Sequence, residues 1–409
     1  MINTRIYNIL KQLDKPFLNR FLKFIDSPYH NRNQKVTSLA QLLINNIKSP
    51  EKLPGKQEIW EIIFESNTYD DLKFRKLCND VLERFEKFLI TEQLDENNLL
   101  KSNLLLNALK SNNIEEIIEK HISRSSRQFE RELDQSSEFY LQKYQYERTL
   151  QNLKTNYEKK ANIKSYLNNY RYLDLSQNLD SFYVIEKLRH ATDILTWRKM
   201  YKTDIEIDLG FTLELIKLYN LDDHPAVKIY LYMYQILSGD GDIDTYFEFK
   251  EISFKYIDVF PDEERREIMD VLFNFCVKQI NSGDKSFYIE LLELYDWGID
   301  SEIILTNSIL SPTSFRNYVI SGLRIGEFDR VQKFILEKSD FLEESRRENA
   351  INFNMARVCF YKKQFDDVLN YLNKVNYDDI WYNLNSKNYL LAVYYELGED
   401  MVLESQMDS

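Results

Sequence analysis

The sequence contains little glycine and proline, the two residues that most often mark tight turns. Nine Gly and seven Pro make up about 4% of the 409 residues, whereas average proteins contain about 12%. Sheets joined by hairpins need such residues, while helices joined by short polar loops need fewer of them. This scarcity predicts an all-α fold. The length predicts two or three structural units or one long array of repeats.

Cysteine is also rare, and its three copies lie far apart in the sequence. Cys78, Cys276 and Cys359 form no CxxC pair and have no pair of histidines beside them, so no disulfide framework or zinc motif is recognisable. No run of 18 apolar residues occurs, and the first residues lack the apolar stretch and cleavage site of a signal peptide. We therefore expect a cytoplasmic protein that does not span a membrane.

The net charge of −13 is unevenly distributed. Residues 1–100 carry 15 Lys and Arg against 14 Asp and Glu, whereas residues 101–409 carry 38 against 52. An acidic surface repels nucleic acid and favours solubility. Only the nearly neutral N-terminal region is therefore compatible with a nucleic-acid surface, and nucleic acid is an unlikely partner of the chain as a whole.

Residues 1–97 are expected to form a helical module. Asp14 can cap a helix that has Pro16 in its first turn and ends at Ser27-Pro28. Further helices are expected at 34–47, 58–64 and 72–90. The last has the clearest pattern, because its apolar side chains recur at spacings of three and four: Phe74, Leu77, Cys78, Val81, Phe85, Phe88 and Leu89.

Residues 98–200 are predicted to form long polar helices that pack as antiparallel pairs, since a lone helix of such polarity would be marginal. A coiled coil is the alternative, but no heptad pattern persists for three or four repeats. Residues 201–409 are periodic, with turns near Gly239, Gly283 and Gly326. A period of about 35–45 residues with two helices per unit is typical of an α-solenoid.

The last three units of this periodic region resemble tetratricopeptide repeats. In NFNMARVCFYKKQFDDVLNYLNKV, Ala356 occupies the small-residue position of the first helix and Phe365 the turn. The preceding unit has Gly322 and Phe328 at matching places. The resemblance covers residues 312–409 and implies a right-handed α-solenoid of antiparallel helix hairpins, although the usual Trp, the second-helix Ala and the closing Pro of the family are absent. Residues 401–409 are expected to begin a second helix that is too short to complete its hairpin, so a capping helix is missing or the product is truncated.

The N-terminal module is similar to the opening of an uncharacterised bacterial family of helical-repeat proteins. The family has an SPYFN-like turn, to which Ser27-Pro28-Tyr29-His30-Asn31 corresponds here. Since that family has no assigned activity, this resemblance implies an architecture and no reaction.

Tetratricopeptide geometry implies a concave groove lined by the first helix of each unit, and such grooves bind peptides or helices. Arginine there would suit an acidic partner, because guanidinium groups bind carboxylates in a bidentate manner. Ordinary solvated surface charges are the alternative interpretation. The predicted groove residues are Arg316, Arg324, Arg357, Tyr361, Asn388 and Tyr395.

A DNA-binding regulator is the alternative function. The helix pair 58–64 and 72–90 resembles the DNA-contacting helices of transcriptional activators that precede tetratricopeptide repeats. The residues that would then meet phosphates are Lys73, Lys76, Arg84 and Lys87. Against this, Asp80 and Glu83 share the same surface.

No sequence motif of an enzyme or of a cofactor site is present. His30, His121, His190 and His224 stand in no metal-binding or nucleophile motif, and no glycine-rich phosphate loop occurs. The alternating Asp240, Asp242 and Asp244 lack the glycine and the distal glutamate of a calcium loop. We therefore expect no catalytic residues, no cofactor and no metal, and predict a non-catalytic scaffold that binds a protein or peptide partner.

Overall fold

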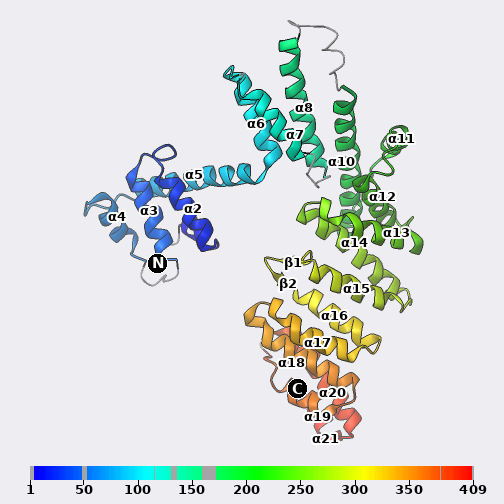
Figure 1. Ribbon diagram of the computed structural model, residues 1–409. Coiled ribbons are helices and arrows are strands. Elements are labelled where there is room, and N and C mark those ends of the chain that lie inside the picture. Colours follow the sequence, from blue (N-terminus) through cyan, green and yellow to red (C-terminus); the bar gives the residue numbers. More distant parts are fainter. Residues whose placement is uncertain are drawn as a thin grey trace. The chain divides into compact units, whose positions relative to one another are not determined.

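The chain is almost entirely helical and divides into two compact units, which are described separately (Figure 1). The computed structural model describes residues 4–47, 53–114, 116–129, 136–158, 172–377 and 379–407. The first unit comprises Met1–Arg131 and Gln145–Tyr170, and the second comprises Glu132–Tyr144 and Arg171–Ser409. The prediction of an all-α fold is confirmed for the described residues, apart from one short pair of strands.

The first unit contains the helices α1 to α7 and most of α8. Their bounds are α1 Arg5–Leu10, α2 Lys15–Asp26, α3 Gln34–Asn45, α4 Lys56–Phe64, α5 Asp71–Glu96, α6 Asn98–Ser111, α7 Ile118–Phe129 and α8 Ser137–Glu158. The predicted cap of α2 is confirmed, because the Asp14 carboxylate accepts a hydrogen bond from the Phe17 backbone N–H at 2.7 Å. Helix α5 extends six residues beyond the predicted end at residue 90, since no Gly or Pro interrupts it.

The apolar stripe of α5 packs against α2 and α3 and forms the core of this unit. The Phe21 ring of α2 meets Phe85 at 5.1 Å and Phe88 at 5.5 Å. Leu89 was wrongly assigned to this stripe, because 40% of its surface is exposed. Its position lies one residue beyond Phe88, which turns its side chain by about 100° away from the core.

The SPYHN turn between α2 and α3 is organised by a buried amide. The Asn31 side chain donates to the Ile25 carbonyl oxygen at 3.1 Å and to the Thr37 hydroxyl at 2.9 Å, and its oxygen accepts from the Asn33 N–H. His30 stacks on Phe24 with ring centroids 3.9 Å apart. The turn is therefore fixed by side chains on both of its sides.

The second unit contains the remaining elements of the described chain. Their bounds are α10 Tyr172–Tyr201, α11 Gly210–Leu218, α12 Pro225–Ser238, α13 Ile243–Tyr256, η2 Ile257–Val259, α14 Asp262–Asn281, α15 Phe287–Asp300, β1 Leu305–Thr306, β2 Ile309–Leu310, α16 Pro312–Arg324, α17 Phe328–Lys338, η3 Ser339–Phe341, α18 Glu344–Tyr361, α19 Phe365–Leu372, α20 Ile380–Leu397 and α21 Asp400–Met407. Strands β1 and β2 form a two-residue antiparallel ladder in which Leu305 faces Leu310. Sequence patterning gave no sign of this hairpin, whose turn residues Asn307 and Ser308 both have positive φ.

Five helices of this unit end in the same way, with one left-handed residue. The five residues are Asn220, Gly283, Gly326, Lys363 and Gly398, with φ between 52° and 103°. The N–H of the following residue bonds a carbonyl oxygen five positions back, for example Gln364 to Cys359 at 2.9 Å and Glu399 to Tyr394 at 3.0 Å. The predicted turns at Gly283 and Gly326 are therefore helix ends, and Lys363 fills the same role without being a glycine.

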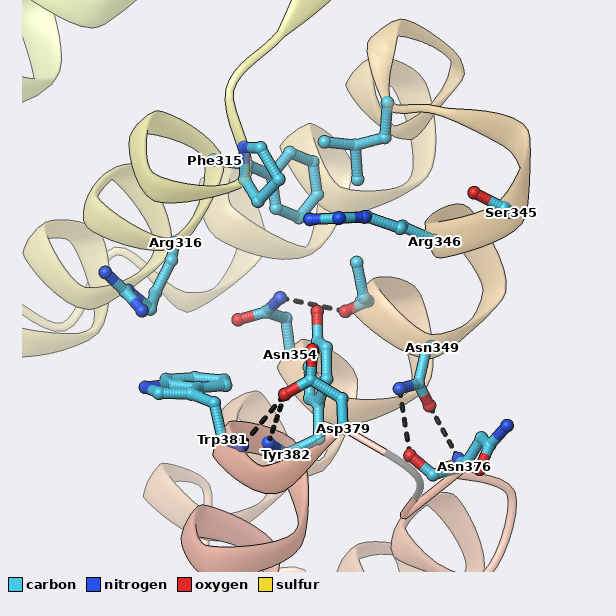
Figure 2. Close-up of a pocket in the computed structure, with 13 residues that line it drawn as sticks. Phe315, Arg316, Ser345, Arg346, Asn349, Asn354, Asn376, Asp379, Trp381 and Tyr382 are labelled. Atoms are coloured by element: carbon cyan, nitrogen blue, oxygen red, sulfur yellow. Dashed lines mark hydrogen bonds between the residues drawn. The ribbon is translucent and has the colours of Figure 1, made fainter. Parts of the chain in front are cut away.

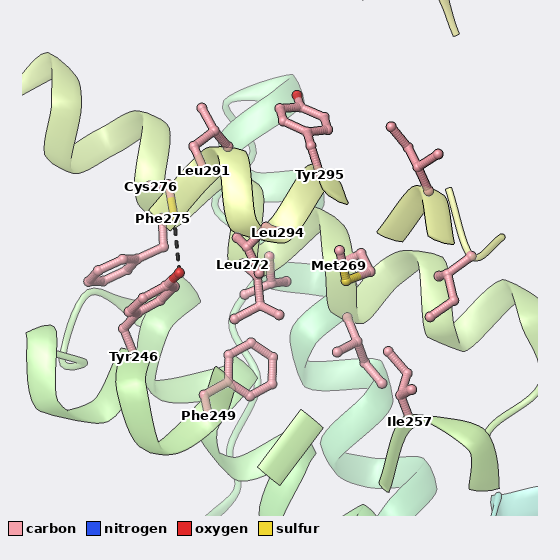
Figure 3. Packing of buried hydrophobic residues seen from close by; sticks show 14 of the residues in the cluster. Tyr246, Phe249, Ile257, Met269, Leu272, Phe275, Cys276, Leu291, Leu294 and Tyr295 are labelled. Carbon is pink, nitrogen blue, oxygen red and sulfur yellow. Dashed lines mark hydrogen bonds between the residues drawn. The ribbon is translucent and has the colours of Figure 1, made fainter. Parts of the chain in front are cut away.

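Large buried side chains from many helices of this unit form its main core. Figure 3 shows part of this core, where the Tyr246 ring stacks on Phe275 at 4.7 Å and its hydroxyl lies 3.2 Å from the Cys276 sulfur. At Gly322, helix α16 packs closely against α17. A Cβ added there would lie 2.2 Å from a methyl group of Val331 on α17, so only glycine fits.

Candidate functional site

A pocket of about 320 Å³ opens between the starts of α16, α18 and α20 (Figure 2). This volume lies at the lower end of the range for small-ligand sites, and it suits one or two side chains of a bound segment. Its walls are Pro312, Phe315, Arg316, Leu342, Ser345, Arg346, Asn349, Ala350, Asn354, Asn376, Asp379, Trp381 and Tyr382.

Two guanidinium groups reach the pocket from different helices. The guanidinium of Arg316 in α16 lies 4.8 Å from the ring centroid of Trp381 in α20, which orients it by a cation–π interaction. The second guanidinium, that of Arg346 in α18, lies 3.4 Å from the exposed Glu343 carboxylate. Two cations thus face one small cavity, and Glu343, the ion-pair partner of Arg346, is accessible to water.

The electrostatic field of both arginines reaches the Tyr382 hydroxyl. Burial and the neighbouring Asp379 carboxylate raise the pKa of Tyr382, whereas Arg316 and Arg346 act in the opposite direction. Because the raising effects prevail, Tyr382 stays a neutral hydroxyl that can donate a hydrogen bond. The pocket is therefore lined by two cations and a phenol donor together with the apolar side chains of Phe315, Leu342 and Ala350.

Hydrogen bonds hold the start of α20 in place. The Asn349 amide donates to the Asn376 carbonyl oxygen at 3.1 Å and accepts from the Asn376 N–H at 2.7 Å. The Asp379 carboxylate accepts from the backbone N–H groups of Trp381 and Tyr382 at 2.8 and 3.4 Å. Its charge is thus engaged by a helix N-terminus, where an anion is stabilised. The aromatic wall of the pocket is therefore positioned before any ligand arrives.

The other predicted groove residues lie outside this pocket. Arg357 is 8% exposed, and it donates to the Tyr389 hydroxyl at 3.2 Å while lying over the Phe353 ring. Tyr361 packs partly buried against the main core. Arg324, Asn388 and Tyr395 are exposed. Of the six residues, only Arg316 is brought to the cavity.

Sequence reasoning missed Arg346, Trp381 and Tyr382, which complete the pocket. Arg346 lies in the first turn of its helix, and Trp381 is the second residue of α20, two positions after the helix cap Asp379. Periodicity aligns the middles of helices and says little about their first turns, and it is the first turns of α16, α18 and α20 that meet at this pocket. An aromatic pair just behind an N-cap is the signal that was available.

The basic face of α5 is mixed in charge. Lys73 lies 3.5 Å from the Asp70 carboxylate, and Arg75 lies 2.7 Å from that of Asp71. Arg84 was placed on the outer face, but only 25% of its side chain is exposed, and it lies 3.8 Å from the Glu83 carboxylate. Lys76 and Lys87 are exposed. The predicted phosphate-binding stripe is thus interleaved with carboxylates.

The polar residues His121 and Asp242 hydrogen-bond within the fold. His121 lies 3.0 Å from the Ser102 carbonyl oxygen and 3.4 Å from the Ser125 hydroxyl, and Ser125 is 1% exposed and bonded to the His121 carbonyl oxygen. The carboxylate of Asp242 caps α13 by accepting from the Thr245 N–H at 2.9 Å.

No metal-binding or membrane-spanning feature occurs in the part of the chain that the structure describes. Within those residues, no three His, Cys, Asp or Glu side chains gather in a way that could hold a metal ion. None of the helices described there combines the length and apolar character needed to cross a bilayer.

Comparisons of the chain with family models, with curated protein sequences and with solved structures gave no match.

Proposed function

We propose that this chain is a non-catalytic interaction scaffold that binds a carboxylate-bearing segment of a protein partner in the pocket between α16, α18 and α20. The observation that supports this function is the pair Arg316 and Arg346 above an aromatic wall. Guanidinium groups bind carboxylates through two parallel hydrogen bonds, and such bonds strengthen where water is partly excluded. A cavity of this size takes the side chains of an extended peptide and no folded domain.

The proposal includes the architecture around the pocket. Residues 312–409 would form three hairpins of a right-handed tetratricopeptide-like solenoid, following the module similar to the SPYFN-type bacterial family. Two findings support such stacking: the repeated left-handed helix ends, and the tight contact of Gly322 with the second helix of its hairpin. Ala356, the small residue of the next unit, is fully buried. A cytoplasmic location and the absence of catalysis belong to the same proposal.

Affinity purification from the native host, with and without nuclease, would identify the partner. A protein that is retained after nuclease treatment at near-equal stoichiometry supports the scaffold. The segment bound by the pocket would then be synthesised with free and with amidated carboxylates.

The double substitution of Arg316→Gln with Arg346→Gln tests the pocket itself. We expect it to weaken binding of that segment by about 30–1,000-fold, because it removes two charge-assisted contacts that contribute about 1–2 kcal/mol each. Amidation of the peptide carboxylates should produce a loss of the same size in the unsubstituted protein. Arg324→Gln, an exposed arginine outside the pocket, is the matched control and should leave affinity unchanged. Equal affinity of the double variant would refute the proposal.

A further inference from the structure

Helix α20 presents an apolar stripe to solvent on the side opposite its core contacts. Ser386 and Val393 are its buried residues. Ile380, Leu384 and Tyr395 are 84%, 61% and 74% exposed, and their spacing of 4 and 11 positions places them on one helix face. Leu391 lies between them on the same face and is half-buried. A row of large apolar side chains of this kind, rather than a single one, marks an interaction surface.

The preceding unit shows what such a face contacts. Lys363 follows the end of α18, Gly398 follows the end of α20, and both have positive φ. Because these two residues are 35 positions apart, each residue of α18 can be aligned with the residue of α20 that lies 35 positions later. In this alignment, Leu384 corresponds to Asn349 and Tyr395 corresponds to Phe360. Asn349 bonds the Asn376 backbone in the loop that leads into α20, and the ring centroids of Phe360 and Tyr389, a residue of α20, lie 5.1 Å apart. The stripe of α20 is therefore the equivalent of the α18 face that the next helix covers.

The charges beside the stripe select the kind of helix that fits. Between residues 380 and 407 the only cationic side chain is Lys387, whereas Glu396, Glu399, Asp400 and Glu404 carry negative charge. All four carboxylate residues are exposed. A second copy of this chain would bring a second set of these carboxylates to the same contact, which like-charge repulsion disfavours. A basic helix would meet complementary charge.

We infer that the open face of α20 and α21 is a docking site for an amphipathic helix of a partner protein, with an apolar stripe and basic flanks. The partner helix packs on α20 as α20 packs on α18, with its Lys or Arg side chains facing the carboxylates of α21. This surface is separate from the pocket residues Arg316 and Arg346, so a partner can occupy both or either. Recognition of an amphipathic helix through spaced apolar anchors is a general mode of binding.

The test uses a fluorescein-labelled, 14-residue amphipathic peptide of Leu and Lys, titrated into the full chain and followed by anisotropy. A peptide of the same composition with the amphipathic order scrambled is the control for unspecific attraction to an acidic protein. We expect the amphipathic peptide to bind at least about tenfold more tightly than the scrambled one, since apolar anchors dominate such contacts.

Leu384→Asp with Tyr395→Asp should weaken binding of the amphipathic peptide by about tenfold or more. Both side chains are exposed, so circular dichroism and thermal melting should match the unsubstituted protein. The matched control is Phe211→Asp with Leu218→Asp on α11, two apolar residues that are 64% and 71% exposed in the same unit. It should bind the peptide like the unsubstituted chain.

Three outcomes would overturn the inference. One is equal binding of the ordered and the scrambled peptide. Another is an affinity that the substitutions at Leu384 and Tyr395 leave unchanged. The third is a dimer in sedimentation velocity that the same substitutions dissociate, because the face would then be occupied by a second copy of this chain.

Discussion

Replacing Gly322 with alanine tests the close contact between α16 and α17. The added methyl group would lie 2.2 Å from Cγ2 of Val331, a side chain that is fully buried. Valine in a helix has one strongly preferred rotamer, so it cannot turn away without strain. Overpacking of this kind lowers the free energy of unfolding by about 1–3 kcal/mol, whereas the better helix propensity of alanine raises it by about 1 kcal/mol. The clash is severe, so we expect a net loss of about 1–2 kcal/mol.

Urea unfolding followed by circular dichroism measures this loss, and a double-mutant cycle assigns it to the contact. Val331→Ala alone should cost about 2 kcal/mol because it leaves a cavity. The double variant should be more stable than the sum of the single changes predicts by about 1 kcal/mol, since the new methyl group occupies the space of the lost ones. Gly298→Ala in α15 is the control. Its Cβ would meet only the ends of the Ile304 and Met269 side chains at 3.0–3.1 Å, so its cost should be smaller.

A neutral or stabilising effect of Gly322→Ala would refute the reasoning. It would mean that α16 and α17 can separate by a few tenths of an ångström at no cost. Additive single changes in the cycle would equally show that the two positions are not in tight contact. Either result would also remove the support that this contact gives to tetratricopeptide-like stacking.

Three further measurements follow from the structure. Lys363→Gly should stabilise the protein by about 0.5–1 kcal/mol in urea unfolding, because Lys363 adopts φ 58° at a helix end; unchanged stability would contradict this. Burial lowers the pKa of His224 to about 4, below its ordinary 6.5, so its contribution to stability is complete above pH 6.5 and is lost as pH falls from there towards 4. His224→Asn should reduce the fall in stability across that interval by roughly 2–3 kcal/mol, and an unchanged pH profile would show that another group titrates. For the DNA-binding alternative, any DNA affinity measured by anisotropy should be sensitive to salt and abolished by Lys73→Glu with Lys76→Glu; the scaffold proposal expects no such dependence.

Most of the helices could be predicted from the sequence, because apolar spacing depends on local geometry alone. The stripe from Phe74 to Phe88 and the cap at Asp14 are examples that the structure confirms. The errors occur where a residue's surroundings come from another helix. Arg357 was expected to face a partner, yet the ring of Phe353 and the hydroxyl of Tyr389 enclose it, and no local pattern reveals this.

The pocket could be predicted only in part for the same reason. Arg316 was named because tetratricopeptide geometry implies that it lies on the first helix of a hairpin. Arg346 and Trp381 come from α18 and α20, and their approach to Arg316 depends on how these three helices pack together. The hairpin of β1 and β2 was missed because two paired residues leave no detectable alternation.

The pocket wall formed by Trp381 and Tyr382 belongs to the first turn of α20, where the Asp379 carboxylate accepts hydrogen bonds from both backbone N–H groups. Proteins open locally as well as globally, and a local opening of the hairpin α20–α21 would separate this turn from α16 and α18. Opening that hairpin removes the aromatic wall and frees Arg316 from Trp381. A ligand in the pocket therefore suppresses local unfolding in proportion to its occupancy, and hydrogen exchange of the α20 amides reports binding without any change in the average structure.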